Sequence, residues 1–137
     1  MLALSLDDLD FADAWLEGDE SARWRSASGH SPSNGAAASS GSSVLEVGPG
    51  CKLPEHTDSA EETIVVLNGT AEVQVGDETA QVAAGGLALV PKDVPHEVRN
   101  AADEVLRFAA VYAEPDVVTT YREPVQPDGS RERHTVS

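Results

Sequence analysis

Four side chains in the middle of the sequence have the types and spacing of ligands for a divalent cation. His56 and Asp58 are two residues apart, so an extended segment would point both toward the same face. Glu62 lies at the start of the next predicted strand, and His96 follows a proline-containing turn 34 residues after Glu62. Neutral imidazole nitrogens and ionised carboxylates are donors that suit divalent transition metals. A fold that gathers all four on its inside would therefore hold a metal site.

The segments that must position these residues have the pattern of short β-strands. Apolar and β-branched runs alternate with turn signals between residues 44 and 112, at intervals too short for helices. We predict strands at residues 44–47, 52–56, 62–67, 71–75, 79–83, 87–90, 96–100 and 105–112. Eight short antiparallel strands favour a closed barrel or jelly roll, because closure removes exposed sheet edges. The predicted fold class is all-β, a small antiparallel β-barrel with an arm at each end.

Two glycine-containing pairs predict tight turns in this region. Asn68-Gly69 is the strongest hairpin signal in the chain, because both residue types tolerate a positive φ, and Gly76-Asp77 is a weaker one. A hairpin at Asn68-Gly69 would make the strands on either side neighbours in a meander. The apolar side chains expected to face one another across it are Val65, Leu67, Val73, Val75 and Val82.

Two stretches of this region resemble the two sequence motifs of the cupin family. The first is Gly50-x5-His56-x-Asp58-x3-Glu62-x6-Gly69, and the second is Gly85-x5-Pro91-x-Asp93-x2-His96-x3-Asn100. The 15 residues between them, 70–84, match the short connection of small single-domain bacterial cupins. Two positions depart from the pattern, since Asp58 stands where the family usually has a second His and Asp93 where a turn Gly is usual.

The resemblance implies a jelly-roll cupin, or double-stranded β-helix, in which His56, Glu62 and His96 ligate the metal. Two histidines and one carboxylate suit Fe(II) and its oxygen chemistry, and Mn, Ni, Co and Zn also bind such sites. Two alternatives stay open for Asp58. Direct ligation would make the site harder and favour Mn or Fe over Cu, whereas the shorter side chain could instead contact the metal through water or orient a ligand.

The N-terminal segment, residues 1–43, is predicted to be an acidic arm followed by a flexible loop. Ser5 and Asp8 have the spacing of a capping box, so the arm is predicted as a short amphipathic helix or, alternatively, as an extended segment. Residues 22–27 allow a strand. Residues 26–43 are rich in Ser, Ala and Gly, which predicts a flexible loop or lid that contains His30.

The C-terminal segment, residues 113–137, follows the predicted barrel domain at 44–112. Its prolines exclude a long helix, and its first apolar residues indicate an extended arm that packs on the barrel or on a neighbouring subunit. The last eight or so residues are expected to fray. The cupin resemblance implies a homodimer formed by sheet extension.

Composition narrows the classes of partner. The 137 residues include 24 acidic and 9 basic ones, for a formal net charge of −15. Such a surface repels nucleic-acid phosphates and anionic lipids, so we predict neither nucleic-acid nor membrane binding. The single cysteine, Cys51, excludes an internal disulfide. The first residues lack the pattern of a signal peptide, which makes a cytoplasmic protein the default prediction.

Three function classes fit these observations. The leading hypothesis is a metal-dependent enzyme that acts on a small organic molecule, of dioxygenase, lyase, decarboxylase or isomerase type, including a biosynthetic tailoring step. The second is a non-catalytic module that senses a small ligand or a metal, and the third is a structural cupin without metal. Trp24, Arg107 and Tyr112 are candidates for the wall of a substrate pocket.

Overall fold

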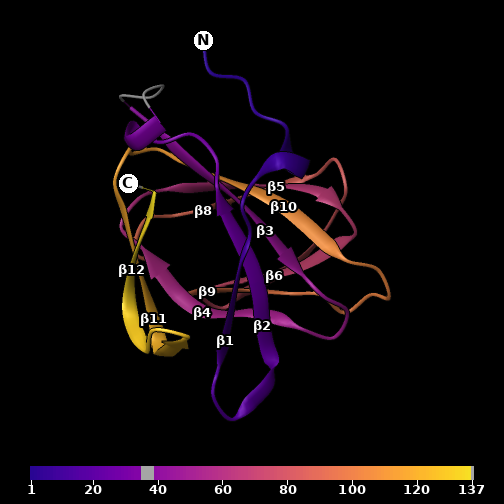
Figure 1. Ribbon diagram of the computed structural model, residues 1–137. Helices are drawn as coiled ribbons and strands as arrows, with labels where there is room; N and C mark the ends of the chain where they lie inside the picture. The colour runs from indigo at the N-terminus through magenta and orange to yellow at the C-terminus, as the bar shows by residue number, and fades with distance from the viewer. Residues whose placement is uncertain (35–38, 137) are drawn as a thin grey trace.

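The protein is all-β in the part of the chain that the computed structural model describes, residues 1–34 and 39–136. One antiparallel sheet of 12 strands curls into a nearly closed barrel (Figure 1). The strands are β1 Ala12–Leu16, β2 Asp19–Ser28, β3 Gly41–Val47, β4 Lys52–Asp58, β5 Glu62–Asn68, β6 Thr70–Val75, β7 Glu78–Ala83, β8 Leu87–Val90, β9 His96–Arg99, β10 Leu106–Tyr112, β11 Val117–Gln126 and β12 Ser130–Val136. The predicted fold class is therefore confirmed.

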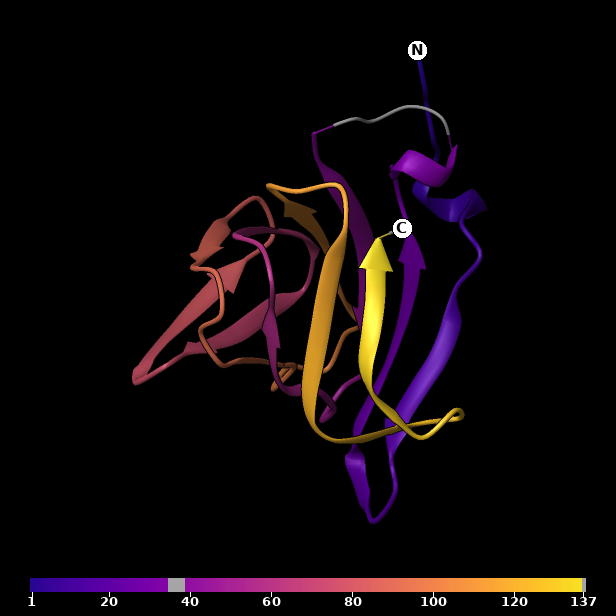
Figure 2. The ribbon, with the colours of Figure 1, turned by 90° about the vertical axis from the view of Figure 1, so that its left-hand side faces the viewer.

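The order of strands across the sheet is β7-β6-β9-β4-β11-β1-β2-β3-β10-β5-β8, and β12 pairs with β11. The eight strands predicted from the pattern between residues 44 and 112 are all present as β3 to β10, with ends that shift by up to a few residues. Viewed from the side, the N-terminal strands and the C-terminal hairpin lie on the same side of the barrel (Figure 2).

The hydrophobic core lies between the inward faces of these strands. Along β5 the buried positions are Glu62, Ile64 and Val66, and the residues between them are more exposed, as the twofold period of a strand requires. Phe108 on β10 is fully buried against the same core. Each such apolar side chain contributes about 1.5–3 kcal/mol of burial free energy. The row that carries the core thus begins with an acidic residue, Glu62, at one end of the barrel.

The Asn68-Gly69 pair makes a corner rather than the hairpin that the sequence predicts. β5 pairs with β8 and β10, whereas β6 pairs with β7 and β9, so the strands on either side of the corner are not neighbours. Gly69 has a φ of +81°, and a Cβ there would lie 3.0 Å from the carbonyl oxygen of Val105. The turn signal correctly indicated a positive φ, but it carries no information on which strands pair. The weaker signal, Gly76-Asp77, does close a hairpin, between β6 and β7.

The N-terminal segment is extended and forms strands, which is the second of the two predicted alternatives, and the amphipathic helix is absent from residues 1–34. A single 3-10 turn at Leu6–Asp8 is present, and the Ser5 side chain makes no capping hydrogen bond. β1 and β2 form a hairpin, in which β1 also pairs with β11 and β2 also pairs with β3. The strand expected at 22–27 is part of β2. Pairing on both sides satisfies backbone groups that a short helix would have left to solvent.

The Ser/Ala/Gly-rich segment is partly ordered by local hydrogen bonds. His30 Nδ1 and Nε2 lie 2.7 and 2.9 Å from the hydroxyls of Ser42 and Ser40. A second 3-10 turn spans Pro32–Asn34. Residues 35–38 of the predicted lid lie outside the described residues. His30 lines a groove beside the N-terminal leucines and does not line the cavity that contains the candidate metal ligands.

The C-terminal segment is built into the sheet of its own chain. β11 pairs with β4 and β1, and β12 pairs with β11. Residues 130–136, where fraying was expected, are therefore a strand, because β11 supplies their backbone partners. This pairing places residues of β11 directly beside β4, which carries His56 and Asp58.

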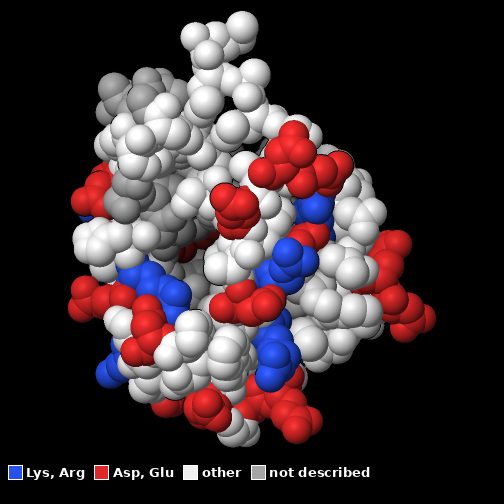
Figure 3. All heavy atoms as spheres, viewed as in Figure 1, with Lys and Arg blue, Asp and Glu red and all other residues white. Residues whose placement is uncertain are grey.

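One face of the molecule carries a row of basic side chains bordered by acidic ones (Figure 3). Arg107 pairs with Glu46 and Asp7 at 3.0 and 3.1 Å, and Arg25 pairs with Glu46 at 3.3 Å. Both guanidinium groups also lie within 6 Å of the Phe11 ring. These contacts hold the acidic N-terminal segment on the barrel. No helix among residues 1–34 and 39–136 is long and apolar enough to span a bilayer.

Candidate metal centre

The structure brings the four candidate ligands together at one end of the barrel. β4 contributes His56 and Asp58, β5 begins with Glu62, and β9 begins with His96. All four side chains are buried, and one ligand atom from each lies within 4.8 Å of the others. His56 and His96 are opposite each other in the pairing of β4 with β9, which explains why residues far apart in the sequence meet.

The ligand atoms point toward a common centre. His96 Nε2 lies 3.1 Å from both Oε1 of Glu62 and Oδ2 of Asp58. His56 Nε2 lies 3.7 Å from the same Oδ2 atom. Three different strands thus direct two nitrogens and two oxygens at one point, which is the donor set predicted from the sequence.

Backbone carbonyls set the orientation of both imidazole rings. His56 Nδ1 lies 2.7 Å from the carbonyl oxygen of Pro54, and His96 Nδ1 lies 2.9 Å from that of Val94. A carbonyl oxygen only accepts hydrogen bonds, so each Nδ1 carries the hydrogen and donates it. The lone pair of each neutral ring is then on Nε2, directed at the centre. Such outer hydrogen bonds are typical of histidines that bind metals.

Asp58 is held by one oxygen and presents the other. Its Oδ1 accepts a hydrogen bond of 2.6 Å from the hydroxyl of Thr119 on β11. Its Oδ2 is buried and has only ion-pair contacts with the histidines, without a hydrogen bond of standard geometry. The turn between β8 and β9 also contacts Asp58, because the Asp93 amide donates a hydrogen bond of 2.9 Å to the Asp58 carbonyl oxygen. Asp93 itself has a φ of +64°. Asp93 adopts the left-handed conformation for which the family usually has Gly.

The protonation of the two histidines differs in the metal-free protein. Burial, with the charge of His96 beside it, lowers the pKa of His56 to about 4. Burial also opposes the charged form of His96, but hydrogen bonds and charges from Asp58 and Glu62 outweigh it and raise the pKa of His96 to about 10. At neutral pH His56 is therefore neutral, and His96 holds a proton between the two carboxylates.

The two carboxylates also differ. Burial and the neighbouring charge of Asp58 raise the pKa of Glu62 to about 7, although hydrogen bonding to His96 opposes this. For Asp58, burial acts upward, but the close contact with His96, the charges of both histidines and the hydrogen bond from Thr119 lower its pKa to about 2. Asp58 thus stays ionised at neutral pH, whereas Glu62 is partly protonated there. A divalent cation would have to displace the proton on His96.

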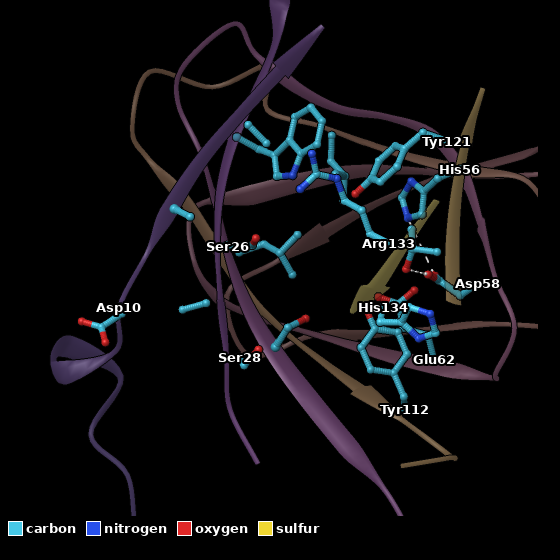
Figure 4. A pocket seen from close by; sticks show the side chains of 18 residues that line it. Asp10, Ser26, Ser28, His56, Asp58, Glu62, Tyr112, Tyr121, Arg133 and His134 are labelled. Atoms are coloured by element: carbon cyan, nitrogen blue, oxygen red, sulfur yellow. Dashed lines mark hydrogen bonds and ion pairs between the residues drawn. The ribbon is translucent and has the colours of Figure 1, made fainter. Parts of the chain in front are cut away.

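A cavity of about 310 Å³ opens onto this cluster (Figure 4). Three aromatic side chains line it. Trp24 and Tyr121 stack with ring centroids 5.5 Å apart, Tyr121 lies 5.2 Å from the His56 ring, and Tyr112 lies beside Glu62 in the pairing of β10 with β5. The polar lining includes Ser43, Thr119 and Arg133.

The pocket candidates from the sequence divide accordingly. Trp24 and Tyr112 line the cavity as expected, whereas Arg107 lies outside it in the ion pairs with Glu46 and Asp7. Sequence reasoning missed Thr119, Tyr121 and Arg133. The alternation of buried Val117, Thr119 and Tyr121 was available as a signal of an inward-facing strand.

Comparison with known proteins agrees with this geometry. The family model of the Cupin domain matches residues 43–112, which is just over half of the chain. Over 56 residues the chain is 36% identical to an uncharacterised protein of Streptomyces coelicolor, covering 41% of this chain and 52% of that protein. The aligned region thus spans about half the length of this curated relative.

Two solved structures illustrate the shared fold. A predicted oxalate decarboxylase from Thermotoga maritima aligns with a TM-score of 0.70 at 16% identity, covering 82% of this chain and 99% of that chain. The polyketide cyclase RemF from Streptomyces resistomycificus aligns with a TM-score of 0.66 at 23% identity, covering 85% of this chain and 83% of that one. Identities this low establish the fold alone. The match of the Cupin domain over residues 43–112 shows that the chain belongs to the cupin family.

Proposed function

We propose that this cupin is a metal-dependent enzyme that acts on a small organic molecule in the cavity beside His56, Asp58, Glu62 and His96. The observation that supports this most directly is the inward direction of both Nε2 atoms, each enforced by a backbone carbonyl at Nδ1. Buried carboxylate and imidazole groups are poorly solvated, and a divalent cation would compensate for their charge. The third hypothesis, a cupin without metal, gives no reason for this orientation.

We propose all four residues as ligands, with Asp58 binding directly. Thr119 occupies only Oδ1 of Asp58, which leaves the buried Oδ2 directed at the centre. Two imidazole nitrogens and two carboxylate oxygens suit Fe, Mn, Zn or Ni. Asp58, where the family usually has a second His, adds a second carboxylate and makes the site harder, which favours Mn or Fe within that group and disfavours Cu.

The bound metal would supply Lewis-acid polarisation of a substrate oxygen or a site for oxygen chemistry. The chain itself supplies the walls and the hydrogen-bond donors. Burial raises the pKa of Tyr112 and of Tyr121 well above the ordinary range, so both hydroxyls keep their protons at neutral pH and can donate to a substrate. Trp24 and Tyr121 exclude water from one side and present flat apolar surfaces.

The structural relatives support an enzyme rather than a sensing module. One is named as a predicted oxalate decarboxylase and the other as a polyketide cyclase, and both names describe reactions of small organic molecules. We therefore place the reaction among the dioxygenase, lyase, decarboxylase and isomerase types, a tailoring step included. A non-catalytic module that senses a small ligand or metal is the alternative, and turnover of any substrate would exclude it.

Metal analysis tests the proposal. Protein purified without chelator and then reconstituted should hold about one equivalent of a transition metal, and less than about a third of an equivalent would contradict it. Glu62→Gln should sharply reduce this content. Glu61→Gln is the matched control, because Glu61 is the adjacent, exposed carboxylate and should retain the metal. Circular dichroism of both variants establishes that they are folded.

We also propose that the protein forms a homodimer, as the cupin resemblance implies. β8 ends the strand order of the sheet, and its outward positions, Leu87 and Leu89, are 65% and 56% exposed. Exposed leucines on an edge strand are suited to pairing with a second copy. A dimer built there would extend the sheet without covering the metal cavity, which has no lining residue on β8.

A further inference from the structure

Three buried side-chain atoms lack a hydrogen bond of standard geometry among the described residues, and all three belong to residues that line the metal cavity. They are Asp58 Oδ2, Arg133 Nε and Ser43 Oγ. Buried polar groups in proteins nearly always have a partner, and those without one are commonly satisfied by water or a ligand. The proposed metal accounts for Asp58. Hydrogen bonding with Tyr112 involves the Ser43 hydroxyl, so the donor that lacks a partner among the described residues is Arg133 Nε.

Arg133 is well placed to receive a ligand. It lies on β12, and its side chain projects into the cavity on the same side as Tyr121 and His56 (Figure 4). Its Nη2 is already held, donating to the Val125 carbonyl at 3.2 Å and to Asp128 at 2.9 Å. These two bonds fix the guanidinium and leave the Nε–H group for whatever fills the cavity. A donor held in this way loses little conformational entropy on binding.

The charge of the lining indicates which group this donor would bind. Arg133 is the only Lys or Arg among the described residues that line the cavity, and the acidic ones are Asp10, Asp58 and Glu62. With a divalent cation bound, the charges of Asp58 and Glu62 are compensated. Arg133 then remains as the basic group of the lining, two strands away from Asp58 in the register of β4, β11 and β12. An anionic oxygen is the ligand that a guanidinium N–H favours.

The remaining walls indicate the rest of the ligand. Trp24, Tyr112 and Tyr121 provide flat apolar surfaces, and the cavity volume is about 310 Å³. An apolar cavity of about half this size accommodates benzene in another protein. The space between the metal ligands and Arg133 therefore suits a ring or short chain that carries one carboxylate.

We propose that Arg133 selects small carboxylic acids with a planar apolar body as the substrates of the metal centre. This inference rests on the proposed function, because it assigns a substrate class to the same cavity. Arg133 acts as a specificity-determining residue that holds the carboxylate, away from the end where the metal would bind the reacting group. If Arg133 holds the carboxylate, the protein should bind an anionic ligand more tightly than a neutral analogue of the same shape.

Benzoate and benzamide are the probes that test this, since they share shape but differ in charge. Trp15→Phe leaves Trp24, in the cavity wall, as the only tryptophan of the chain, so its fluorescence reports binding. In zinc-loaded protein we expect benzoate to bind at least tenfold more tightly than benzamide. Arg133→Gln should abolish this preference, and Arg133→Lys, which keeps the charge but lacks Nε, should retain only part of it.

Arg122→Gln is the matched control, because Arg122 is an exposed arginine on β11 that pairs with Glu55. It should keep the full preference for benzoate. Equal binding of the two probes, or an unchanged preference in a folded Arg133→Gln protein, would overturn the inference. Zinc content is measured on every sample beforehand. A protein that fails to bind zinc refutes the proposed function, whereas one that binds zinc without preferring benzoate refutes only the role of Arg133.

Discussion

The hydroxyl of Thr119 on β11 donates a hydrogen bond of 2.6 Å to Oδ1 of Asp58 on β4. The two residues are opposite each other in the antiparallel pairing of these strands. The C-terminal segment therefore completes the candidate metal centre, although it lies outside the residues matched by the Cupin domain. Thr119 leaves Asp58 with one oxygen directed at the two histidines.

Thr119→Val tests this contact, because it removes the hydroxyl and keeps the shape of the side chain. We expect metal affinity to fall about 10- to 100-fold, the usual effect of losing a partner of a metal ligand. Thr120→Val is the control, since Thr120 is exposed on the opposite face of β11 and should change nothing. Competition titration against a zinc indicator measures both. Equal affinity in the two variants would show that Thr119 does not position Asp58.

Metal affinity should depend on pH through the protons that the centre must release. The pKa of His96 is raised to about 10, so His96 is protonated below that pH and must lose one proton before Nε2 can bind. Apparent affinity should therefore rise about tenfold per pH unit between pH 7 and 9. The pKa of Glu62 is raised to about 7, so a second proton is released below pH 7 and the dependence becomes steeper there.

Calorimetry in buffers of different ionisation enthalpy counts these protons directly. We expect about one proton released per zinc at pH 8 and about two at pH 6. His56 contributes little at either pH, because its pKa is lowered to about 4. Zinc binding without proton release at pH 8 would mean that His96 is not a ligand.

The close approach at Gly69 should make this corner sensitive to substitution. Gly69 has a φ of +81°, and an added Cβ would meet the Val105 carbonyl at 3.0 Å and the Leu106 Cα at 3.2 Å. Gly18 has a nearly equal φ of +80°, but an added Cβ there has no neighbour within 4 Å. Gly18→Ala should cost about 1–2 kcal/mol of unfolding free energy from backbone strain alone. Gly69→Ala should cost at least about 1 kcal/mol more.

Urea denaturation gives the free energy of unfolding of the two glycine variants. The difference between them separates the cost of the steric clash at Gly69 from the cost of backbone strain, which both share. A loss in Gly69→Ala no larger than that in Gly18→Ala would show that the corner relaxes without cost. Both variants should retain the metal, because neither glycine lines the cavity.

The strands and the grouping of the four candidate metal ligands could be predicted from the sequence, because both leave local patterns. Alternating apolar residues and short turns specify strands locally, and the cupin motifs place His56, Asp58, Glu62 and His96 at set distances along the chain. The place of Thr119, Tyr121 and Arg133 in the cavity could not be predicted, because they reach it through the pairing of β11 with β4 and β12. Alternation along β11 indicates an inward face, but it does not indicate which strand, about 60 residues away in the sequence, lies beside it.

Two predictions, the hairpin at Asn68-Gly69 and the N-terminal helix, failed because pairing between distant strands decides the outcome there. Asn68-Gly69 indicates a positive φ, which a corner between strands of different pairs also requires, so the residues alone do not distinguish it from a hairpin. The acidic N-terminal segment has little helical driving force of its own. Its conformation is decided by β3 and β11, which accept β2 and β1 as neighbours.

The proposed homodimer can be tested on the edge strand β8. Leu87→Lys combined with Leu89→Lys should convert a dimer to a monomer, because lysines on an edge strand oppose pairing with another copy. Thr79→Lys is the control, since Thr79 is an exposed residue on β7, the other end of the strand order. Light scattering after size exclusion gives the mass of each. A monomeric wild-type protein, or a dimeric double-lysine variant, would refute this interface.

We propose that one metal ion is bound through the atoms that face the common centre of His56, Asp58, Glu62 and His96. Anomalous diffraction from crystals grown with zinc would locate that ion. We expect one strong peak at about 2.0–2.2 Å from both Nε2 atoms and from a carboxylate oxygen of each acidic residue, with Asp58 using Oδ2. A fully loaded protein whose zinc peak lies elsewhere, or a cluster without a peak at saturating zinc, would contradict it.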